Sequence, residues 1–178
     1  MPSGAKAPIS SARAARLKPG PTQRFLKTSS SLIGGIIHLE FTTHSPEETI
    51  ALGRTLAPML TPPKLVVLRG ELGAGKTTLV KGIAEAFHAA SQEDVTSPTF
   101  TLVHEYRGPQ ANLFHIDLYR IETERALETL GLDDFMGGNN LLLIEWGEKF
   151  PRLTRDRDVE IAIERVGPDA RKFVVTAK

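Results

Sequence analysis

The sequence contains no cysteine, which excludes disulfide bonds and any metal site built from thiolate ligands. Long apolar runs are also missing, because the longest, around residues 32–39 and 141–144, fall far short of the roughly 20 residues that span a membrane. The five histidines lack the H-x-x-x-H type of spacing that a zinc site uses, so we interpret each as a surface or internally hydrogen-bonded residue. These absences predict a cytoplasmic protein that does not enter a membrane.

Basic residues are concentrated near the start of the chain, although the net charge of the 178 residues is only +1. Residues 1–39 carry six basic side chains and no acidic one, which leaves 16 basic and 21 acidic residues in the rest of the chain. A net charge of −5 in this larger part disfavours direct binding of nucleic acid, because phosphate backbones are bound by basic surfaces. A partner protein would have to supply that surface.

The first 31 residues are rich in alanine, serine, proline, lysine and arginine and show little apolar periodicity. This composition is typical of a disordered extension. It is also similar to an organellar transit peptide, but prolines interrupt any amphipathic helix there. We predict a disordered basic extension over residues 1–31 and a single folded domain over residues 36–178.

Residues 70–77 read Gly-Glu-Leu-Gly-Ala-Gly-Lys-Thr and match the phosphate-binding pattern G-x-x-x-x-G-K-[ST]. A β-branched run at residues 64–68 precedes the motif and a helical pattern at residues 78–87 follows it, as a phosphate-binding loop requires. Glycines let backbone N–H groups converge on phosphate oxygens, and the start of the helix adds a positive end. The motif therefore predicts a nucleoside triphosphate site.

The residue types of this motif predict a nucleoside triphosphate and Mg²⁺ as its ligands. Lys76 is expected to contact the β- and γ-phosphates, and the Thr77 hydroxyl is expected to bind Mg²⁺. Trp146, the only tryptophan, is expected to pack against the nucleotide, a partner or the core. The expected nucleotide-binding residues are Gly70, Glu71, Leu72, Gly73, Ala74, Gly75, Lys76, Thr77, Thr78 and Trp146.

The remaining pattern predicts an α/β fold. Ser45, Pro46 and Glu48 are typical of a helix start, and the turn at residues 108–109 predicts an antiparallel hairpin. The run at residues 141–144 is typical of a central parallel strand. The expected strands are residues 36–41, 64–68, 101–106, 112–119, 140–144, 159–166 and 172–176, and the expected helices are 46–59, 78–87 and 122–130. Together they predict a P-loop NTPase-like sandwich with a mixed, mainly parallel sheet, an antiparallel hairpin and the nucleotide at the C-terminal edge of the parallel strands.

Two acidic residues are candidates for the carboxylate that a phosphate loop needs near Mg²⁺. Glu145 follows an apolar strand, as a Walker B acid does, and Asp117 shares one face of its strand with Leu113, His115 and Tyr119. We predict that Glu145 and Thr77 bind the metal, while Asp117 orients the attacking water or couples to a switch loop at residues 97–99. The reverse assignment stays open, as does a structural salt bridge from Asp117 to a nearby arginine such as Arg120. The candidate catalytic residues are Lys76, Asp117 and Glu145.

Four segments, taken in order, resemble the TsaE (YjeE) family. They are Gly-Glu-Leu-Gly-Ala-Gly-Lys-Thr-Thr at 70–78, Thr-Ser-Pro-Thr-Phe-Thr-Leu-Val at 96–103, His-Ile-Asp-Leu-Tyr-Arg at 115–120 and Ile-Glu-Trp at 144–146. The second and third make the resemblance specific, and it extends over roughly residues 39–176. The residues that match the family's functional positions are Lys76, Thr77, Asp117, Glu145 and Trp146. Glu71 stands where the family often has Asp, a change that leaves phosphate binding intact.

The resemblance implies that residues 36–178 are a small P-loop ATPase domain, which binds ATP and is weak alone. It implies that this ATPase belongs to the bacterial machinery that makes threonylcarbamoyladenosine (t6A) in tRNAs reading codons that begin with A. It implies docking on the TsaB–TsaD heterodimer, where ATP hydrolysis supports turnover of the threonylcarbamoyl transferase and tRNA is contacted only through the complex.

Three other functions are compatible with a phosphate loop. A small-molecule kinase would use Arg152, Arg155 and Arg157 as a basic lid over a second substrate. A GTPase would carry an Asn-Lys-x-Asp element, which does not occur in this sequence. A nucleotide-gated binding module would bind ATP with negligible hydrolysis.

Overall fold

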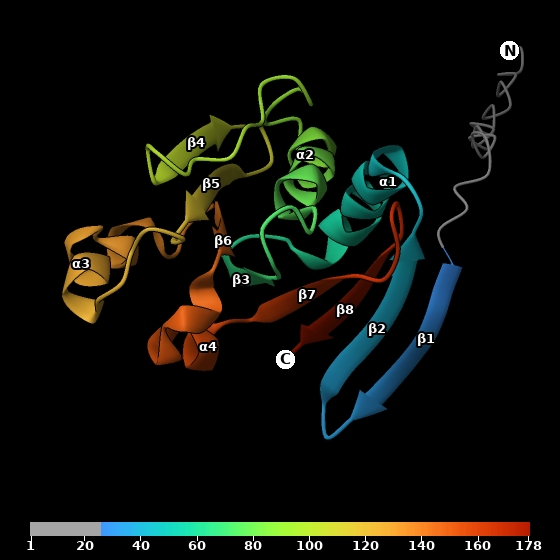
Figure 1. Cartoon of the computed structure of the whole chain (residues 1–178). Helices are drawn as coiled ribbons and strands as arrows, with labels where there is room; N and C mark the ends of the chain where they lie inside the picture. Colours follow the sequence, from blue (N-terminus) through green and yellow to red (C-terminus); the bar gives the residue numbers. More distant parts are fainter. Residues whose placement is uncertain (1–25) are drawn as a thin grey trace, which may run out of the picture.

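Eight β-strands form one mixed sheet in the computed structural model, which describes residues 26–178 (Figure 1). The order of the strands across the sheet is β1-β2-β8-β7-β3-β6-β5-β4. The strands are β1 Leu26–Ile33, β2 Ile36–Thr43, β3 Lys64–Arg69, β4 Val103–Arg107, β5 Asn112–Asp117, β6 Asn140–Glu145, β7 Val159–Arg165 and β8 Arg171–Ala177. The helices are α1 Pro46–Leu56, α2 Lys76–Ala86, α3 Glu124–Thr129 and α4 Pro151–Asp156, with 3-10 helices η1 Ala57–Met59, η2 Leu132–Phe135 and η3 Gly147–Lys149.

The parallel part of the sheet is its centre, where β7, β3, β6 and β5 run side by side. Antiparallel pairs flank it, with β4 on one side and β8, β2 and β1 on the other. The predicted mixed sheet and the predicted β4–β5 hairpin are confirmed. The parallel pairs are confined to the centre of the sheet in the described residues, because tight turns join β1 to β2 and β7 to β8 and such turns pair strands antiparallel.

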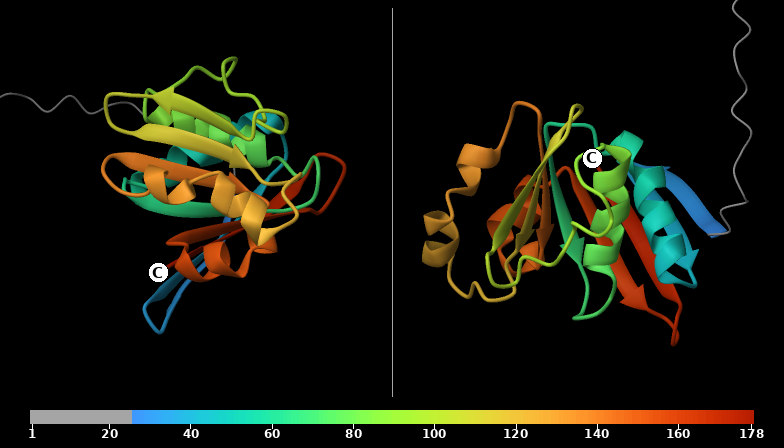
Figure 2. Two further views of the ribbon diagram at one scale, coloured as in Figure 1. Left: turned by 90° about the vertical axis from the view of Figure 1, so that its left-hand side faces the viewer. Right: turned by 90° about the horizontal axis from the view of Figure 1, so that it is seen from above.

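Helices cover both faces of the sheet (Figure 2), and each face has its own apolar core. On one face α1 and α2 cover a core that includes Val66, Leu68 and Phe173. On the other, the segments around α3 and α4 cover a core that includes Val67 and Ile144. Strand β6 lies between two parallel neighbours with residues 141–144 buried, which confirms it as a central strand covered on both faces. Among the described residues, no helix combines the length and the apolar character that a membrane crossing demands.

Helix α1 begins as its sequence predicts. The Ser45 hydroxyl accepts a hydrogen bond from the Glu48 N–H at 3.1 Å, and the Glu48 carboxylate accepts one from the His44 N–H at 2.7 Å. The helix ends at Leu56 and passes into η1, so the expected single helix to residue 59 is divided. Gly82 of α2 packs so closely on α1 that a side chain there would collide with the Ile50 carbonyl.

Strand β1 falls inside the segment that was predicted to be disordered, so this prediction is wrong for residues 26–31 and the folded domain begins before residue 36. The reason is a hairpin: Gly34 and Gly35, at φ of 58° and 83°, form a tight turn that returns the chain along β2. Pairing with β2 compensates for the weak apolar pattern of this strand. Residues 1–25 of the predicted extension lie outside the described residues.

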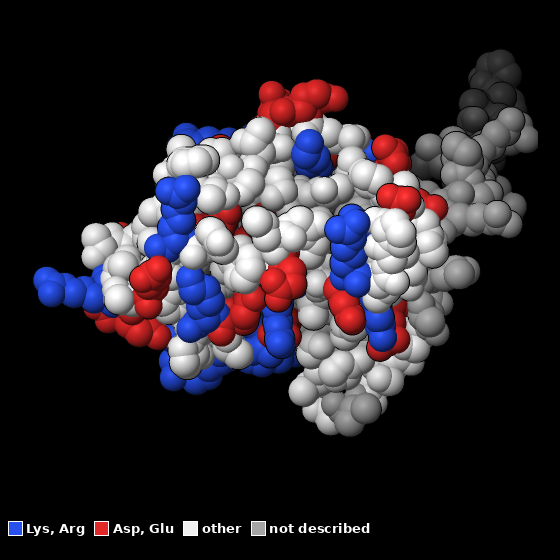
Figure 3. Space-filling model, viewed as in Figure 1, with Lys and Arg blue, Asp and Glu red and all other residues white. Residues whose placement is uncertain are grey.

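Basic and acidic side chains are interspersed over the face of the molecule seen in Figure 3. Among the described residues, Lys172 contacts Glu40 at 3.3 Å and Arg54 contacts Glu85 at 2.8 Å. Alternating charges produce a weak field at a distance. On this face the described residues therefore form no basic surface of the kind that binds nucleic acid.

Candidate functional site

The phosphate-binding loop lies between β3 and α2, in the strand–loop–helix arrangement that its sequence predicts. Gly70 has φ of 154°, and a β-carbon there would lie 2.6 Å from the Ile163 carbonyl oxygen. Gly75 has φ of 110° and directly precedes α2. Only glycine adopts these conformations readily, so the loop needs glycine at both positions. Lys76 and Thr77 consequently stand in the first turn of α2.

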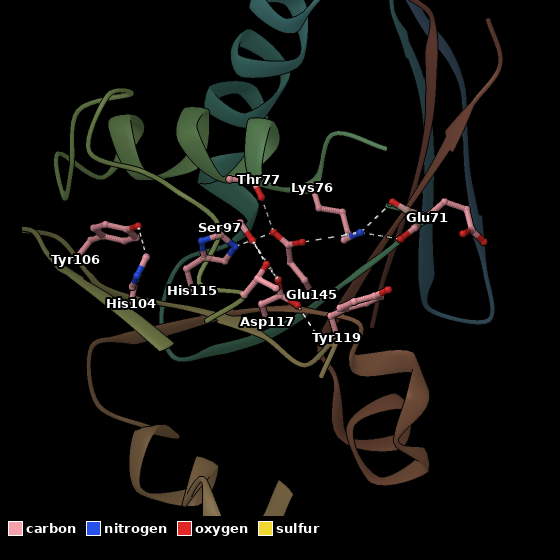
Figure 4. Close-up of polar contacts among 12 residues, drawn as sticks. Glu71, Lys76, Thr77, Ser97, His104, Tyr106, His115, Asp117, Tyr119 and Glu145 are labelled. Carbon is pink, nitrogen blue, oxygen red and sulfur yellow. Dashed lines mark hydrogen bonds and ion pairs between the residues drawn. The ribbon is translucent and has the colours of Figure 1, made fainter. Parts of the chain in front are cut away.

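The Lys76 ammonium lies at the centre of this loop (Figure 4) and is 4% exposed. Its Nζ donates to the carbonyl oxygens of Gly70 at 2.7 Å and Glu71 at 3.1 Å. It lies 4.4 Å from the centre of the Trp146 ring and 3.8 Å from Glu145 Oε2. A buried cation held mainly by carbonyl dipoles and a ring face is well placed to bind an anion.

Glu145 joins the loop to the sheet, because its Oε1 accepts hydrogen bonds from two different elements. Thr77 Oγ1 in α2 donates at 2.8 Å, and His115 Nε2 in β5 lies 2.8 Å away (Figure 4). The carboxylate ends β6 and is 4% exposed. The two residues predicted to bind the metal, Thr77 and Glu145, are therefore in direct contact with each other.

Asp117 lies directly opposite Glu145 on the neighbouring strand but binds a different part of the chain. Its Oδ2 accepts from Ser97 Oγ at 3.0 Å and from Thr99 Oγ1 at 2.7 Å, and its Oδ1 accepts from the Tyr119 N–H at 2.9 Å. The contacts with residues 97–99 agree with the predicted coupling to that loop. A salt bridge between Asp117 and Arg120, the alternative considered, is not formed among the described residues. The Arg120 guanidinium instead lies over the Phe100 ring, 4.4 Å from its centre.

These side chains meet at a cavity of about 460 Å³, a volume within the range of ligand sites. Its lining residues are Leu72, Gly73, Gly75, Lys76, Thr77, Thr78, Ser97, Thr99, Asp117, Tyr119, Glu145 and Trp146. Three residues predicted to bind nucleotide, Gly70, Glu71 and Ala74, line a second cavity of about 640 Å³ on the other side of the loop. The Tyr119 and Trp146 rings lie 5.2 Å apart between their centres and form an aromatic wall of the first cavity.

The donor set at this cavity fits Mg²⁺ bound together with phosphates. Mg²⁺ usually takes one or two carboxylates, keeps several waters and binds substrate phosphates. Thr77, Glu145 and Asp117 supply a hydroxyl and two carboxylates at one cavity. Among the described residues no group of three or more His, Asp or Glu side chains is arranged to hold a metal alone. Such a site would therefore bind the metal with the nucleotide rather than before it.

His115 is internally hydrogen-bonded, which is one of the two states expected for the histidines, but its place in the site was not predicted. It is 0% exposed and contacts Glu145. The signal was present, because His115 stands two residues before Asp117 and therefore on the same face of its strand. Tyr119 also lines the cavity, although the sequence only placed it on the same strand face as Asp117 and did not predict this role. Its expected strand ended at residue 119, whereas β5 ends at Asp117.

A further carboxylate, Glu148, lies near Lys76 but does not line the cavity. Burial raises the pKa of Glu148, and the nearby charges of Lys76 and Arg69 oppose this rise. Its Oε2 atom is buried and has no hydrogen-bond partner among the described residues. Glu148 therefore offers a nearby acid with which the two lining carboxylates can be compared.

The three arginines considered for a kinase lid are paired with acidic residues. Arg152 contacts Asp133, Arg155 contacts Asp156 at 2.8 Å, and Arg157 contacts Glu160 at 2.9 Å. No arginine is among the described residues that line the 460 Å³ cavity. The structure therefore offers no support for a basic lid over a second substrate.

The family model described as "Threonylcarbamoyl adenosine biosynthesis protein TsaE" matches residues 43–173. The "tRNA threonylcarbamoyladenosine biosynthesis protein TsaE" of Bacillus subtilis strain 168 is 39% identical over 139 residues, which are 78% of this chain and 85% of that protein. The protein of the same name from Aquifex aeolicus is 36% identical and is covered to 96%. The crystal structure of Bacillus subtilis YdiB is similar with a TM-score of 0.64 and 34% identity, over 80% of this chain and 86% of that one. These comparisons confirm the resemblance seen in the motifs, and the chain belongs to the TsaE family.

Proposed function

We propose that this chain binds and hydrolyses ATP with Mg²⁺ as a subunit of the bacterial machinery that makes threonylcarbamoyladenosine in tRNA. In that role it supports turnover of the TsaB–TsaD transferase and meets tRNA only through the complex. One observation carries the proposal: Lys76, Thr77 and two carboxylates converge on a single cavity beside a phosphate-binding loop. Membership of the TsaE family, whose relatives are named for this tRNA modification, supplies the biological setting.

Binding of the triphosphate is assigned to the loop and the start of α2. The N–H groups at the start of a helix face outward without intrahelical partners and favour anions. Lys76 adds a full positive charge that already lies within the loop. Thr77 and Glu145 would hold Mg²⁺, directly or through water, and Mg²⁺ bound there would supply positive charge against the phosphate oxygens.

Hydrolysis is assigned to Asp117. Its carboxylate lines the same cavity and is fixed by three hydrogen bonds from residues on its own chain. A carboxylate in such a position can orient a water molecule and accept its proton. Because two of its donors lie in the loop at residues 97–99, a change in that loop on nucleotide or partner binding would alter the orientation of Asp117. If partner binding is needed to bring this loop and Asp117 into the productive orientation, the chain alone would hydrolyse ATP only slowly.

The proposal is tested by measuring ATP binding by isothermal titration calorimetry and phosphate release with and without TsaB and TsaD. We expect Mg-ATP binding by the chain alone and phosphate release that rises when both partners are added, with Lys76→Ala as the inactive control. A chain that binds no Mg-ATP would contradict the proposal. Binding without phosphate release, even with both partners, would favour the nucleotide-gated module, and transfer of phosphate to a small acceptor would favour the kinase.

A further inference from the structure

His115 is the only histidine that is buried among the described residues, and it is 0% exposed. It lies in β5 on the face of the sheet that α2 covers, as shown by its strand neighbour Leu113, which packs in the core of that face. Its ring points at Glu145 on the adjacent strand β6, with Nε2 and Oε1 separated by 2.8 Å (Figure 4). A polar ring in this location needs a hydrogen-bond partner, and Glu145 is that partner.

The hydrogen bonds of the two side chains define which atom donates. An ionised carboxylate only accepts, so the proton lies on His115 Nε2 and points to Glu145 Oε1. His115 Nδ1 is buried and has no partner among the described residues. A buried nitrogen lone pair without a partner is tolerated better than a buried N–H without one, which assigns Nδ1 as the unprotonated nitrogen of the ring.

Two donors therefore fix one oxygen of Glu145. Among the described residues, Thr77 and His115 both donate to Oε1, whereas the contact of Oε2 is the longer one with the ammonium of Lys76, at 3.8 Å. Thr77 belongs to α2 and follows the loop to which phosphate binding is assigned, whereas His115 belongs to the sheet. The sheet therefore supplies a donor whose position does not depend on the loop.

We propose that His115 is a positioning residue, which holds Glu145 in the orientation that presents its second oxygen to the cavity and so to Mg²⁺. The proposal rests on the proposed function, because the metal enters with ATP. Hydrogen-bond partners of metal ligands commonly tune metal affinity by roughly 10- to 100-fold. His115 would do so without touching either the metal or the nucleotide.

The contact itself is tested by long-range ¹H–¹⁵N NMR spectroscopy of the histidine rings in the ligand-free chain. We expect His115 to carry a proton on Nε2. A ring protonated only on Nδ1 would overturn the proposal, because a lone pair would then face the carboxylate. This readout requires neither nucleotide nor activity.

The expected effect of His115 on metal affinity is tested by titrating Mg²⁺ into mixtures of each variant with ATP and measuring nucleotide binding. We expect His115→Met, which is similar in size and has no donor, to raise the Mg²⁺ concentration for half-maximal binding roughly tenfold or more. We expect His115→Gln, whose amide can donate from about the position of Nε2, to restore most of the wild-type value. Nucleotide binding in the presence of a chelator should be the same in all variants.

His104 supplies the matched control, because it pairs with His115 across β4 and β5 and contacts the Tyr106 hydroxyl rather than Glu145. His104→Met should leave the Mg²⁺ requirement unchanged. If His115→Met fails to fold, His115→Gln is compared with His115→Asn, which carries the same amide on a side chain too short to reach Glu145.

The outcomes separate this proposal from the proposed function. A wild-type chain that binds no Mg-ATP would overturn both. Wild-type binding combined with an unchanged Mg²⁺ requirement in His115→Met, or with a Gln variant as defective as the Met variant, would overturn the positioning role alone.

Discussion

Glu145 and Asp117 are paired residues at the ends of neighbouring parallel strands, and their exposed fractions, 4% and 3%, are nearly equal. Their surroundings nevertheless differ. Glu145 is bound by residues of regular elements, Thr77 in α2 and His115 in β5. Asp117 is bound by Ser97 and Thr99, which lie in the segment between α2 and β4 outside any helix or strand.

This difference separates a fixed region of the site from an adjustable one. Side chains on helices and strands are held more precisely than side chains on loops, which suits a metal ligand. Loops that respond to nucleotide or partner are the usual switching elements of phosphate-loop proteins. This difference supports the proposal that the Glu145 region binds the metal and the Asp117 region carries regulated hydrolysis.

Lys76→Ala should have the largest effect, because Lys76 serves both regions through the phosphates. Removing a buried cation from the phosphate loop should weaken Mg-ATP binding by about 2–3 kcal/mol, the range of hydrogen bonds to charged groups. Isothermal titration calorimetry measures this loss. Unchanged affinity would show that the loop is not the nucleotide site and would remove the basis of the comparison.

Asp117→Ala should leave ATP binding largely intact and lower phosphate release in the presence of TsaB and TsaD by about 10² or more, the usual contribution of a positioned base. The measurement is the rate at saturating Mg-ATP. A loss of affinity with an unchanged rate would mean that Asp117 acts in binding, and the two regions would not differ in the way proposed.

Thr99→Val sharpens the comparison by removing only a loop contact. The Thr99 hydroxyl makes the shorter of the two loop hydrogen bonds to Asp117, at 2.7 Å. We expect the same phosphate-release assay to show a loss of about tenfold, equivalent to about 1.4 kcal/mol, with unchanged ATP affinity and an unchanged Mg²⁺ requirement. A raised Mg²⁺ requirement would instead place the loop in the metal-binding region.

Glu148→Gln should have the smallest effect. It tests whether any acidic residue near Lys76 contributes to metal binding, or only Glu145. Burial raises the pKa of Glu148, so its charged form is less favourable in the folded chain. Its contribution to stability therefore falls as the pH rises from its ordinary pKa, about 4, through the raised one. Glu148→Gln should remove this fall and stabilise the chain at pH 7 by less than about 1 kcal/mol, because the side chain is only half buried and solvent screens it.

Thermal unfolding from pH 4 to 8 measures that change. The Mg²⁺ requirement for ATP binding should stay at the wild-type value, since Glu148 does not line the cavity. A metal defect in this variant would contradict the specific role of Glu145.

Local patterns in the sequence predicted those parts of the fold that depend on neighbouring residues. The cap at Ser45 predicted the start of α1, and the apolar run at residues 141–144 predicted a central strand. Strand β1 could not be predicted in this way, because residues 29–31 are three serines and the strand depends on pairing with β2. Propensity is weak where pairing supplies the stability.

In the site, too, local patterns predicted some residues, whereas contacts between strands could not be predicted. The motif and the strand ends identified Lys76, Thr77, Glu145 and Asp117 from sequence spacing. The contact of His115 with Glu145 depends on β5 lying next to β6, which is a property of the sheet order rather than of local sequence. The ring contact of Lys76 with Trp146 likewise follows from the backbone of Trp146, whose φ is 63°.

The division between the two carboxylates is tested most directly by a Mg²⁺ titration of ATP binding, carried out in parallel on Glu145→Ala and Asp117→Ala. We expect Glu145→Ala to raise the Mg²⁺ concentration for half-maximal binding by about 10², equivalent to about 2.7 kcal/mol, and Asp117→Ala to leave it at the wild-type value. A metal defect in Asp117→Ala with a normal requirement in Glu145→Ala would contradict the account and reverse the two roles.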